Sequence, residues 1–341
     1  MTIARRPLSP IVPVAAILAL LTANASLTSA HAGSSLQEAR ARHKTSLRQR
    51  ITYPDPPLSP PLGTVRLVKY PSPAGDLAAY VTPETSDGRR RPAIVWLIGG
   101  FDNGIDYTAW APADVSDDQS ASVFRERGIV TMYPSLRGGN GNPGQVESFY
   151  GEVEDVLAAG RYLAAQPHVD PSRIYLGGHS TGGTLALLAA EATDQFRAVF
   201  SFGPASKASR YDADSVAFDV NNAKESRLRS PVHYLDAIHT PTLIIEGRVS
   251  PSNLVSIREM RRQNPPAAVS FVEVDNADHF SVLAPLSSLL AQKILADTAA
   301  GPNFSISYEE ATDAMETCRR SDGRASERCG SDAKAGLRPP Q

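Results

Sequence analysis

The chain has 341 residues, of which 42% are hydrophobic and 21% charged, a composition typical of a globular protein with a sizeable core. The formal net charge is −2, so no excess of positive charge indicates nucleic acid as a partner. No close pair of His or Cys has the spacing of a zinc site, and no phosphate-binding lysine motif is present. The sequence therefore predicts neither a metal nor a cofactor.

Residues 1–32 have the three-part pattern of an export signal. Arg5 and Arg6 form a basic start, 11–21 is apolar, and small residues follow at 28–32. The apolar run is shorter than the roughly 20 residues that span a bilayer, so we expect cleavage rather than an uncleaved anchor. The pattern predicts a secreted or periplasmic protein without a stable membrane anchor.

Residues 33–62 are expected to form a polar arm that ends in a proline-rich linker. The arm is basic and mildly helical, which is typical of a solvated helix. The linker at 53–61 contains five prolines and has little capacity for helix or sheet. We therefore place the start of the compact domain at residue 63.

Residues 63–308 are expected to form an α/β domain. Two strands around a turn at 71–76 predict a β-hairpin, and apolar strands then alternate with helical patterns. This order predicts a mostly parallel sheet with helices on both faces. The expected strands are 65–70, 77–81, 93–98, 128–133, 174–176, 198–202, 242–245 and 269–274. The expected helices are 153–165, a run from 184, 254–263 and 282–296.

Two further segments lie outside this alternation. The polar stretch 205–229 is expected to be either a small cap over the site or an ordinary surface excursion. Residues 309–341 are expected to be a polar tail, of which the part from residue 318 onward lies outside the core. This tail carries both cysteines, Cys318 and Cys329, which would form a disulfide in an oxidising compartment or otherwise remain free thiols.

The most informative motif is Gly178-x-Ser180-x-Gly182, which stands between the strand 174–176 and the helix that follows. Strand, Gly-x-Ser-x-Gly and helix in this order form the nucleophile elbow of serine hydrolases. The glycines are needed because the serine takes a strained conformation against the neighbouring strand and helix. The motif predicts Ser180 as a nucleophile.

A serine hydroxyl needs a base and an acid that orients the base. Of the seven histidines, only His279 follows a late strand, where we expect the base. An aspartate is expected shortly after the strand 242–245, but Ser250 occupies that position, so we take Glu246 at the strand end as the acid. Other nearby carboxylates stay open as the acid: Asp212, Asp214, Asp275 and Asp278.

An acyl-transfer site also needs two hydrogen-bond donors for the oxyanion. One is expected to be the backbone N–H of Thr181, which follows the nucleophile. The other is expected in the glycine-rich loop after strand 93–98, at Gly100 or Phe101. A plain glycine turn is the alternative explanation of that loop.

These motifs together resemble the α/β-hydrolase superfamily, in particular the prolyl oligopeptidase-like serine peptidases and their dienelactone-hydrolase-like relatives. The resemblance covers about residues 65–296 and includes the runs 135–141, 151–156 and 278–280. It implies an α/β-hydrolase fold with Ser180 as nucleophile and His279 as base, and the family's usual aspartate position falls on Ser250.

The resemblance implies a serine hydrolase acting on a small ester or peptide, and the sequence leaves the preference between them open. The missing aspartate keeps a second hypothesis open, a binding protein that retains the fold but has weakened catalysis. A third hypothesis, an interaction protein of the cell envelope, depends on the polar arms.

Overall fold

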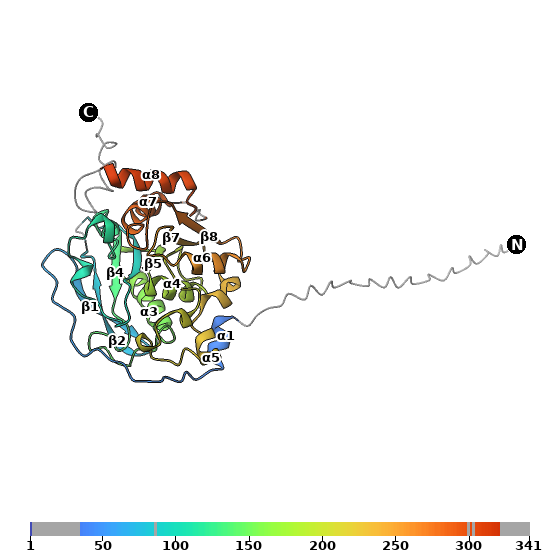
Figure 1. The fold of residues 1–341 in the computed structure, drawn as a ribbon. Coiled ribbons are helices and arrows are strands. Elements are labelled where there is room, and N and C mark those ends of the chain that lie inside the picture. Colours follow the sequence, from blue (N-terminus) through green and yellow to red (C-terminus); the bar gives the residue numbers. More distant parts are fainter. Residues whose placement is uncertain (2–34, 85–86, 299–300, 302–303, 321–341) are drawn as a thin grey trace, which may run out of the picture. The chain divides into compact units, whose positions relative to one another are not determined.

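The computed structural model of the protein describes residues 1, 35–84, 87–298, 301 and 304–320 (Figure 1). The predicted export signal lies outside these residues except for Met1, so export stays a prediction. Within the described ranges, no helix has both the length and the apolar character that a bilayer crossing requires.

The core of the domain is an eight-stranded sheet with the strand order β1-β2-β4-β3-β5-β6-β7-β8. β1 pairs antiparallel with β2, and β2 with β4, whereas all other neighbours are parallel. The prediction of a mostly parallel sheet preceded by a hairpin is confirmed. The strands are β1 (Arg66–Ser72), β2 (Gly75–Val81), β3 (Arg91–Leu97), β4 (Val130–Pro134), β5 (Val169–His179), β6 (Val199–Phe202), β7 (Thr242–Gly247) and β8 (Val269–Val274).

The hairpin turn is shorter than the sequence predicts. We expect a turn over 71–76, but the strand pairing continues to Ser72 opposite Gly75. Only Pro73 and Ala74 remain as the connection. Two-residue loops are a common connection in hairpins, because their twist matches that of the strands they join.

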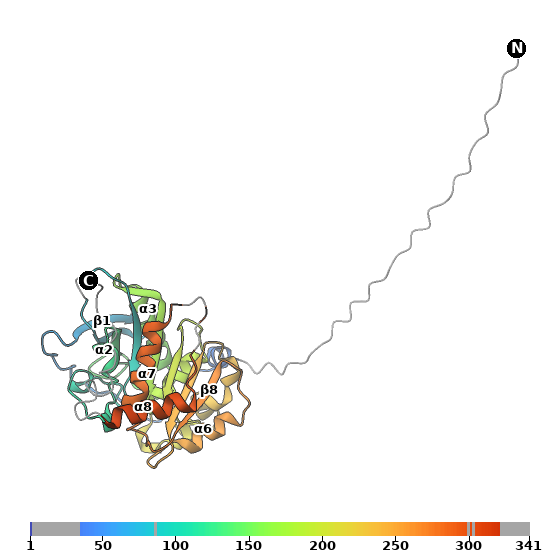
Figure 2. The ribbon, with the colours of Figure 1, turned by 90° about the horizontal axis from the view of Figure 1, so that it is seen from above.

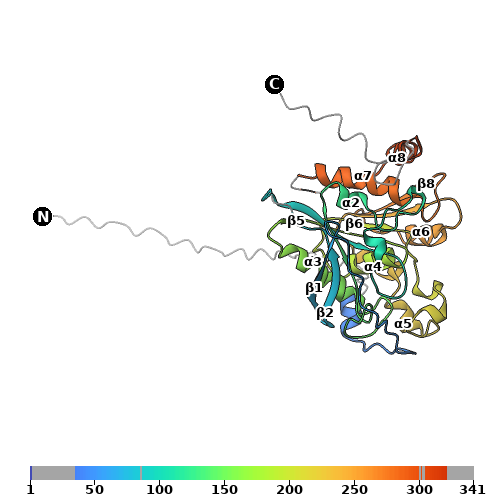
Figure 3. The same cartoon turned by 90° about the vertical axis from the view of Figure 1, so that its left-hand side faces the viewer.

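Helices cover both faces of the parallel part of the sheet (Figure 3). On one face lie α3 (Glu152–Ala164), α4 (Thr181–Ala190) and α6 (Leu254–Arg261), and on the other lie α2 (Val123–Glu126) and α7 (Leu283–Ala296). Side chains of β3 alternate between the two cores: Val95 faces the first, and Trp96 faces the second. A strand that is buried on both faces has a continuous apolar sequence. For this reason β3 could be predicted from the sequence.

The first part of the tail predicted at 309–341 forms α8 (Tyr308–Arg320), and the placement of Cys318 outside the core is wrong. This helix lies across α7 in Figure 2. It buries Ala311 and Met315 in the core beneath α7, and Cys318 against Ala284. The spacing i, i+4, i+7 puts the three on one helix face, but so few apolar residues in a charged segment give a weak signal.

The predicted disulfide is described only at one end. Cys318 is buried and disulfide-bonded, whereas Cys329 lies outside the described residues. The pairing of the two therefore stays a prediction.

The arm predicted to be solvated is packed onto the domain. It contains the short helix α1 (Leu36–Ala41), in which Leu36 is fully buried. Arg40 donates hydrogen bonds of 2.7–2.8 Å to the backbone oxygens of Phe149, Tyr150 and Leu228. The segment that follows continues across the domain, with Tyr53 N–H donating to the Gly138 oxygen at 2.7 Å.

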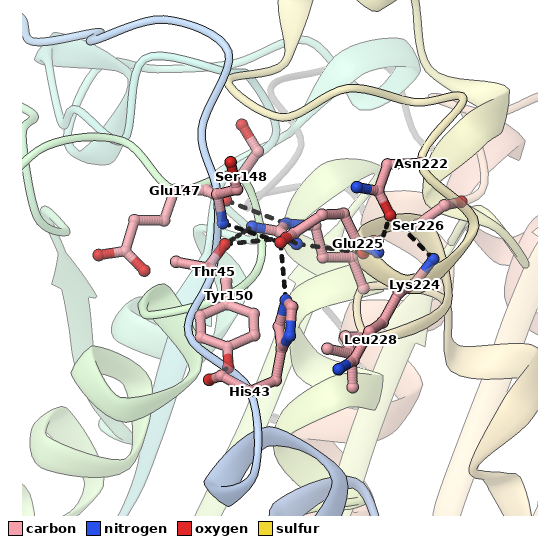
Figure 4. Close-up of polar contacts among 12 residues, drawn as sticks. His43, Thr45, Glu147, Ser148, Tyr150, Asn222, Lys224, Glu225, Ser226 and Leu228 are labelled. Atoms are coloured by element: carbon pink, nitrogen blue, oxygen red, sulfur yellow. Dashed lines mark hydrogen bonds and ion pairs between the residues drawn. The ribbon is translucent and has the colours of Figure 1, made fainter.

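A buried carboxylate connects this arm to α5 (Ala223–Arg227) in the segment predicted to be a cap (Figure 4). Glu225 is 1% exposed and accepts hydrogen bonds from the arm: His43 Nε2 at 2.7 Å, Ser46 N–H at 2.8 Å and Thr45 Oγ1 at 2.9 Å. It also forms an ion pair with the buried Arg229. Burial by itself would raise the pKa of Glu225, but these donors outweigh it and lower the pKa to about 2.

Replacing Glu225 by Ala is expected to lower the free energy of unfolding by about 3 kcal/mol or more, because it leaves the Arg229 charge buried without its partner. Urea unfolding at neutral pH measures this loss. Because the folded pKa lies below the usual value of about 4.3, the wild type should lose this stabilisation as the pH falls from about 4.3 towards 2.

Asp214→Asn is the matched control at the same boundary between arm and cap. It removes an exposed ion pair with Arg48, 3.2 Å long, and exposed pairs contribute little. Equal losses of stability in the two variants would contradict a dominant role for Glu225.

Candidate active site

Ser180 lies in a strained turn between β5 and α4. Its φ angle is +58°, although it is not glycine. The backbone there is tightly packed: a Cβ on Gly178 would lie 2.5 Å from the Gly182 oxygen, and one on Gly182 would lie 2.2 Å from the Leu97 oxygen. The turn holds Ser180 at the start of a buried helix, whose N-terminus favours negative charge.

His279, in the loop after β8, forms a buried pair with Glu246, which lies near the end of β7. Nδ1 of His279 lies 3.2 Å from Oε2 and 3.3 Å from Oε1 of Glu246. Glu246 has no exposed surface, and His279 is 8% exposed. Because Nδ1–H donates to the carboxylate, Nε2 is left as the proton acceptor.

Gly203, directly after β6, makes room for this pair. A Cβ at Gly203 would lie 2.3 Å from Cε1 of His279 and 2.5 Å from Oε2 of Glu246. Its φ angle of +57° also favours glycine. Asn253 fixes this glycine further, since its Nδ2 donates to the Gly203 oxygen at 2.8 Å.

His179 connects the serine turn to the loop of His279. Its Nε2–H donates to the backbone oxygen of His279 at 3.0 Å, and the centroids of the two rings are 4.4 Å apart. Burial, and after it the neighbouring His279, lower the pKa of His179 to about 3. His179 therefore remains neutral and holds the loop of His279 beside the serine turn.

The Ser180 hydroxyl has no hydrogen-bond partner within the described parts of the chain. Hydrogen bonds between a nucleophile and its base are often long in the absence of substrate and shorten when substrate binds. The structure therefore brings Ser180, His279 and Glu246 to one edge of the sheet without a closed Ser180–His279 hydrogen bond.

One oxyanion donor is predicted in the loop after β3, at Gly100 or Phe101, and the N–H of Gly100 is already used in a hydrogen bond. Its N–H donates to Oγ1 of Thr181 at 2.8 Å, and the same hydroxyl donates back to the Gly100 oxygen at 2.7 Å. The N–H of Gly100 is therefore not free to bind an oxyanion, which corrects that candidate and leaves Phe101. The N–H of Phe101 has no partner among the described residues, nor has that of Thr181.

The carboxylates that remained open as the acid are engaged elsewhere or exposed. Asp278 accepts hydrogen bonds within its own turn, from Phe280 and Ser281. Asp275 pairs with Arg248 at 2.8 Å. The other two are exposed: Asp212 and Asp214. Among the residues described, only Glu246 contacts the His279 ring with a carboxylate. No group of three or more His, Cys, Asp or Glu within the described ranges is arranged to hold a metal ion.

The segment 205–229, which contains α5, packs against the loop after β3. The ring of Tyr211 meets Phe101 edge-on at 5.3 Å and stacks on Phe149 at 5.2 Å between centroids. Its hydroxyl lies 2.6 Å from Oγ1 of Thr184 in α4. The segment is therefore a packed wall beside the predicted oxyanion loop.

Three contributors to this arrangement are not predicted from the sequence: His179, the side chain of Thr181, and Gly203. His179 is part of the elbow motif, but the direction of its side chain depends on a contact with His279, 100 residues later in the chain. Thr181 was considered only for its backbone. Gly203 follows a strand and gives no local signal of the ring that contacts it.

Residues 115–279 match the prolyl oligopeptidase family, and this range includes Ser180, Glu246 and His279. The chain is also 31% identical over 196 residues to the uncharacterized peptidase YtmA of Bacillus subtilis. That similarity covers 52% of the present chain and 76% of YtmA.

Solved structures share the fold. A puromycin-hydrolyzing peptidase from Mycobacterium tuberculosis has a TM-score of 0.53 at 22% identity, over 68% of this chain and 40% of that one. Acylaminoacyl peptidase from Pyrococcus horikoshii has a TM-score of 0.53 at 17% identity, over 73% and 44%. An esterase from Pyrobaculum calidifontis has a TM-score of 0.50 at 20% identity, over 70% and 88%. The fold is thus that of the α/β hydrolases, and the chain spans less than half the length of these two solved peptidases.

We expect the ring of His179 to stay neutral from about pH 8 to pH 5, because its pKa is lowered to about 3. Ring nitrogen chemical shifts in a pH series of NMR spectra measure this. In urea-unfolded protein the same residue should titrate near the ordinary value of about 6.5. A midpoint between pH 5 and 7 in the folded protein would contradict its burial against His279.

Proposed function

The chain belongs to the prolyl oligopeptidase family of serine hydrolases, and we propose that it is exported and cleaves an ester or amide bond at Ser180. The observation that carries this proposal is the buried His279–Glu246 pair, at 3.2 Å, next to a serine in a strained turn. The export pattern in residues 1–32 motivates the exported location.

In the proposed reaction, Oγ of Ser180 attacks the acyl carbon while Nε2 of His279 takes its proton. Glu246 holds Nδ1–H and stabilises the imidazolium that forms. The N–H groups of Thr181 and Phe101 would bind the oxyanion. His279 then gives the proton to the leaving group, and a water deprotonated by His279 releases the acyl group and restores Ser180.

The names of the relatives support both ester and amide substrates, because they include peptidases and an esterase. Ser250 favours a second candidate function, a binding protein with weakened catalysis, since it stands where the family usually has its aspartate. The contact of Glu246 with His279 supports the hydrolase, because it supplies a carboxylate from a different position. A burst of product from an activated aryl ester would exclude a binding protein with weakened catalysis.

Ser180→Ala is expected to abolish covalent labelling by a fluorophosphonate probe, because it removes the attacking oxygen. Glu246→Gln should lower kcat on an aryl ester by about 10⁴-fold, because an amide does not hold the imidazole in the required tautomer. Asp275→Asn is the control, since Asp275 pairs with Arg248 and should leave kcat unchanged. Labelling of Ser180→Ala, or normal turnover by Glu246→Gln, would refute these assignments.

Gly203→Ala is expected to lower kcat by about 10²-fold or more, because the added Cβ displaces the His279 ring and Glu246, and misplacements near 1 Å cost this much. Gly63→Ala is the matched control for backbone strain, with a φ of +83° but no atom of the described part of the chain within 4 Å of the added Cβ. Steady-state kinetics on an aryl ester compare the two. Equal kcat values would show that the site does not depend on the space at Gly203.

A further inference from the structure

A small cavity lies directly beside the predicted oxyanion donors. Its volume is about 50 Å³, which accommodates a few water molecules or one small group, since a single water needs about 10–15 Å³. The wall combines the oxyanion loop, the first turns of α4 and the turn before α3. Residues of that wall include Gly100, Phe101, Phe149, Glu152, Thr181 and Leu185.

Glu152 is an ionisable residue of this wall, and one of its two carboxylate oxygens forms no hydrogen bond with the described residues. It is 1% exposed. Its Oε1 accepts three hydrogen bonds, from Glu147 N–H at 2.6 Å, Ser148 N–H at 3.0 Å and Asn103 Nδ2 at 3.0 Å. Its Oε2 is buried and has no hydrogen-bond partner among the described residues. Buried polar atoms are nearly always paired, so this oxygen is an open acceptor.

The charge of Arg137 acts on Glu152, but Arg137 does not donate a hydrogen bond to this oxygen. Arg137 donates to both carboxylate oxygens of Asp155 at 2.9 Å and to Glu147 at 3.0 Å. Burial raises the pKa of Glu152, while the hydrogen bond from Asn103 and the charge of Arg137 act against that rise. A second cation next to Oε2 would stabilise the ionised carboxylate.

Resting on the proposed function of Ser180, we propose that Glu152 binds the ammonium group of the substrate, whose acyl part is a short α-amino acyl residue. Thr181 and Phe101 would hold the acyl oxygen, so a cavity that starts at these residues lies beside the acyl carbon. The aromatic and aliphatic wall excludes water, which strengthens a charged hydrogen bond. An N-acylated residue has no ammonium group and is larger, so it should be a poor substrate.

Glu152 also ties Asn103 and the 147–148 turn together, and this structural role must be separated from binding. Glu152→Gln retains one oxygen for the three existing hydrogen bonds, removes the charge and replaces the acceptor Oε2 by an NH2 group, which only donates. Glu191→Gln is the matched control: Glu191 is 3% exposed, follows the far end of α4, and has no hydrogen-bond partner for either carboxylate oxygen among the described residues.

The experiment compares kcat/KM for L-alanine p-nitroanilide with that for its N-acetyl derivative. We expect the wild type to prefer the free amine, and Glu152→Gln to reduce this preference by about tenfold or more, as expected for one charged hydrogen bond. Glu191→Gln should keep the wild-type preference. No preference in the wild type, or an equal fall on both substrates in Glu152→Gln, would overturn the inference.

A binding measurement separates this inference from the proposed function. Calorimetry on Ser180→Ala measures the affinity for the same two compounds without turnover. We expect the free amine to bind more tightly than its N-acetyl derivative, and the difference to be lost when Glu152→Gln is added. This result supports the cavity assignment even if a fluorophosphonate does not label Ser180 in the wild type. Equal affinities for the two compounds overturn it even if Ser180 is labelled.

Discussion

The φ angle of +58° at Ser180 is the constraint around which this edge of the sheet is arranged. Such a conformation in a residue other than glycine persists only where the surrounding packing enforces it. Here Gly178, Gly182 and Leu97 meet at backbone contact distance, and every residue of α4 is buried. The strain is thus maintained by the core, and loops from β3, β6, β7 and β8 need only converge on a serine already held in place.

The His279–Glu246 pair shows how a site can keep its geometry when a carboxylate starts from a different position. Glu246 lies within β7 and is fixed by the sheet, whereas Ser250 lies in the loop beyond it. The longer glutamate side chain extends from the strand to the imidazole. Space for it is made by Gly203 on the neighbouring strand end, so the carboxylate and the glycine have to be considered together.

The parts that could be predicted from sequence are those with local signals. β3 contains a continuous apolar run at 93–97 and β5 a short apolar run at 174–176. Ser180 and His279 each follow a strand. The packing of the arm, and the helix α8, escaped prediction because one buried Leu36, or three apolar residues on a charged helix, carry little weight in a sequence. The contact of His43 with Glu225 joins residues 182 positions apart, and nothing in either segment indicates its partner.

The arm and the cavity are connected through one strained turn. Ser148 and Phe149 have φ angles of +51° and +75°. Glu152 holds this turn from the cavity side through Ser148 N–H, and Arg40 of the arm holds it from outside through the Phe149 oxygen at 2.7 Å. Because Phe149 also stacks on Tyr211, the arm, the 205–229 segment and the cavity wall fix one another. The segment that local sequence patterns describe as a solvated arm therefore helps to position the carboxylate that we assign to substrate recognition.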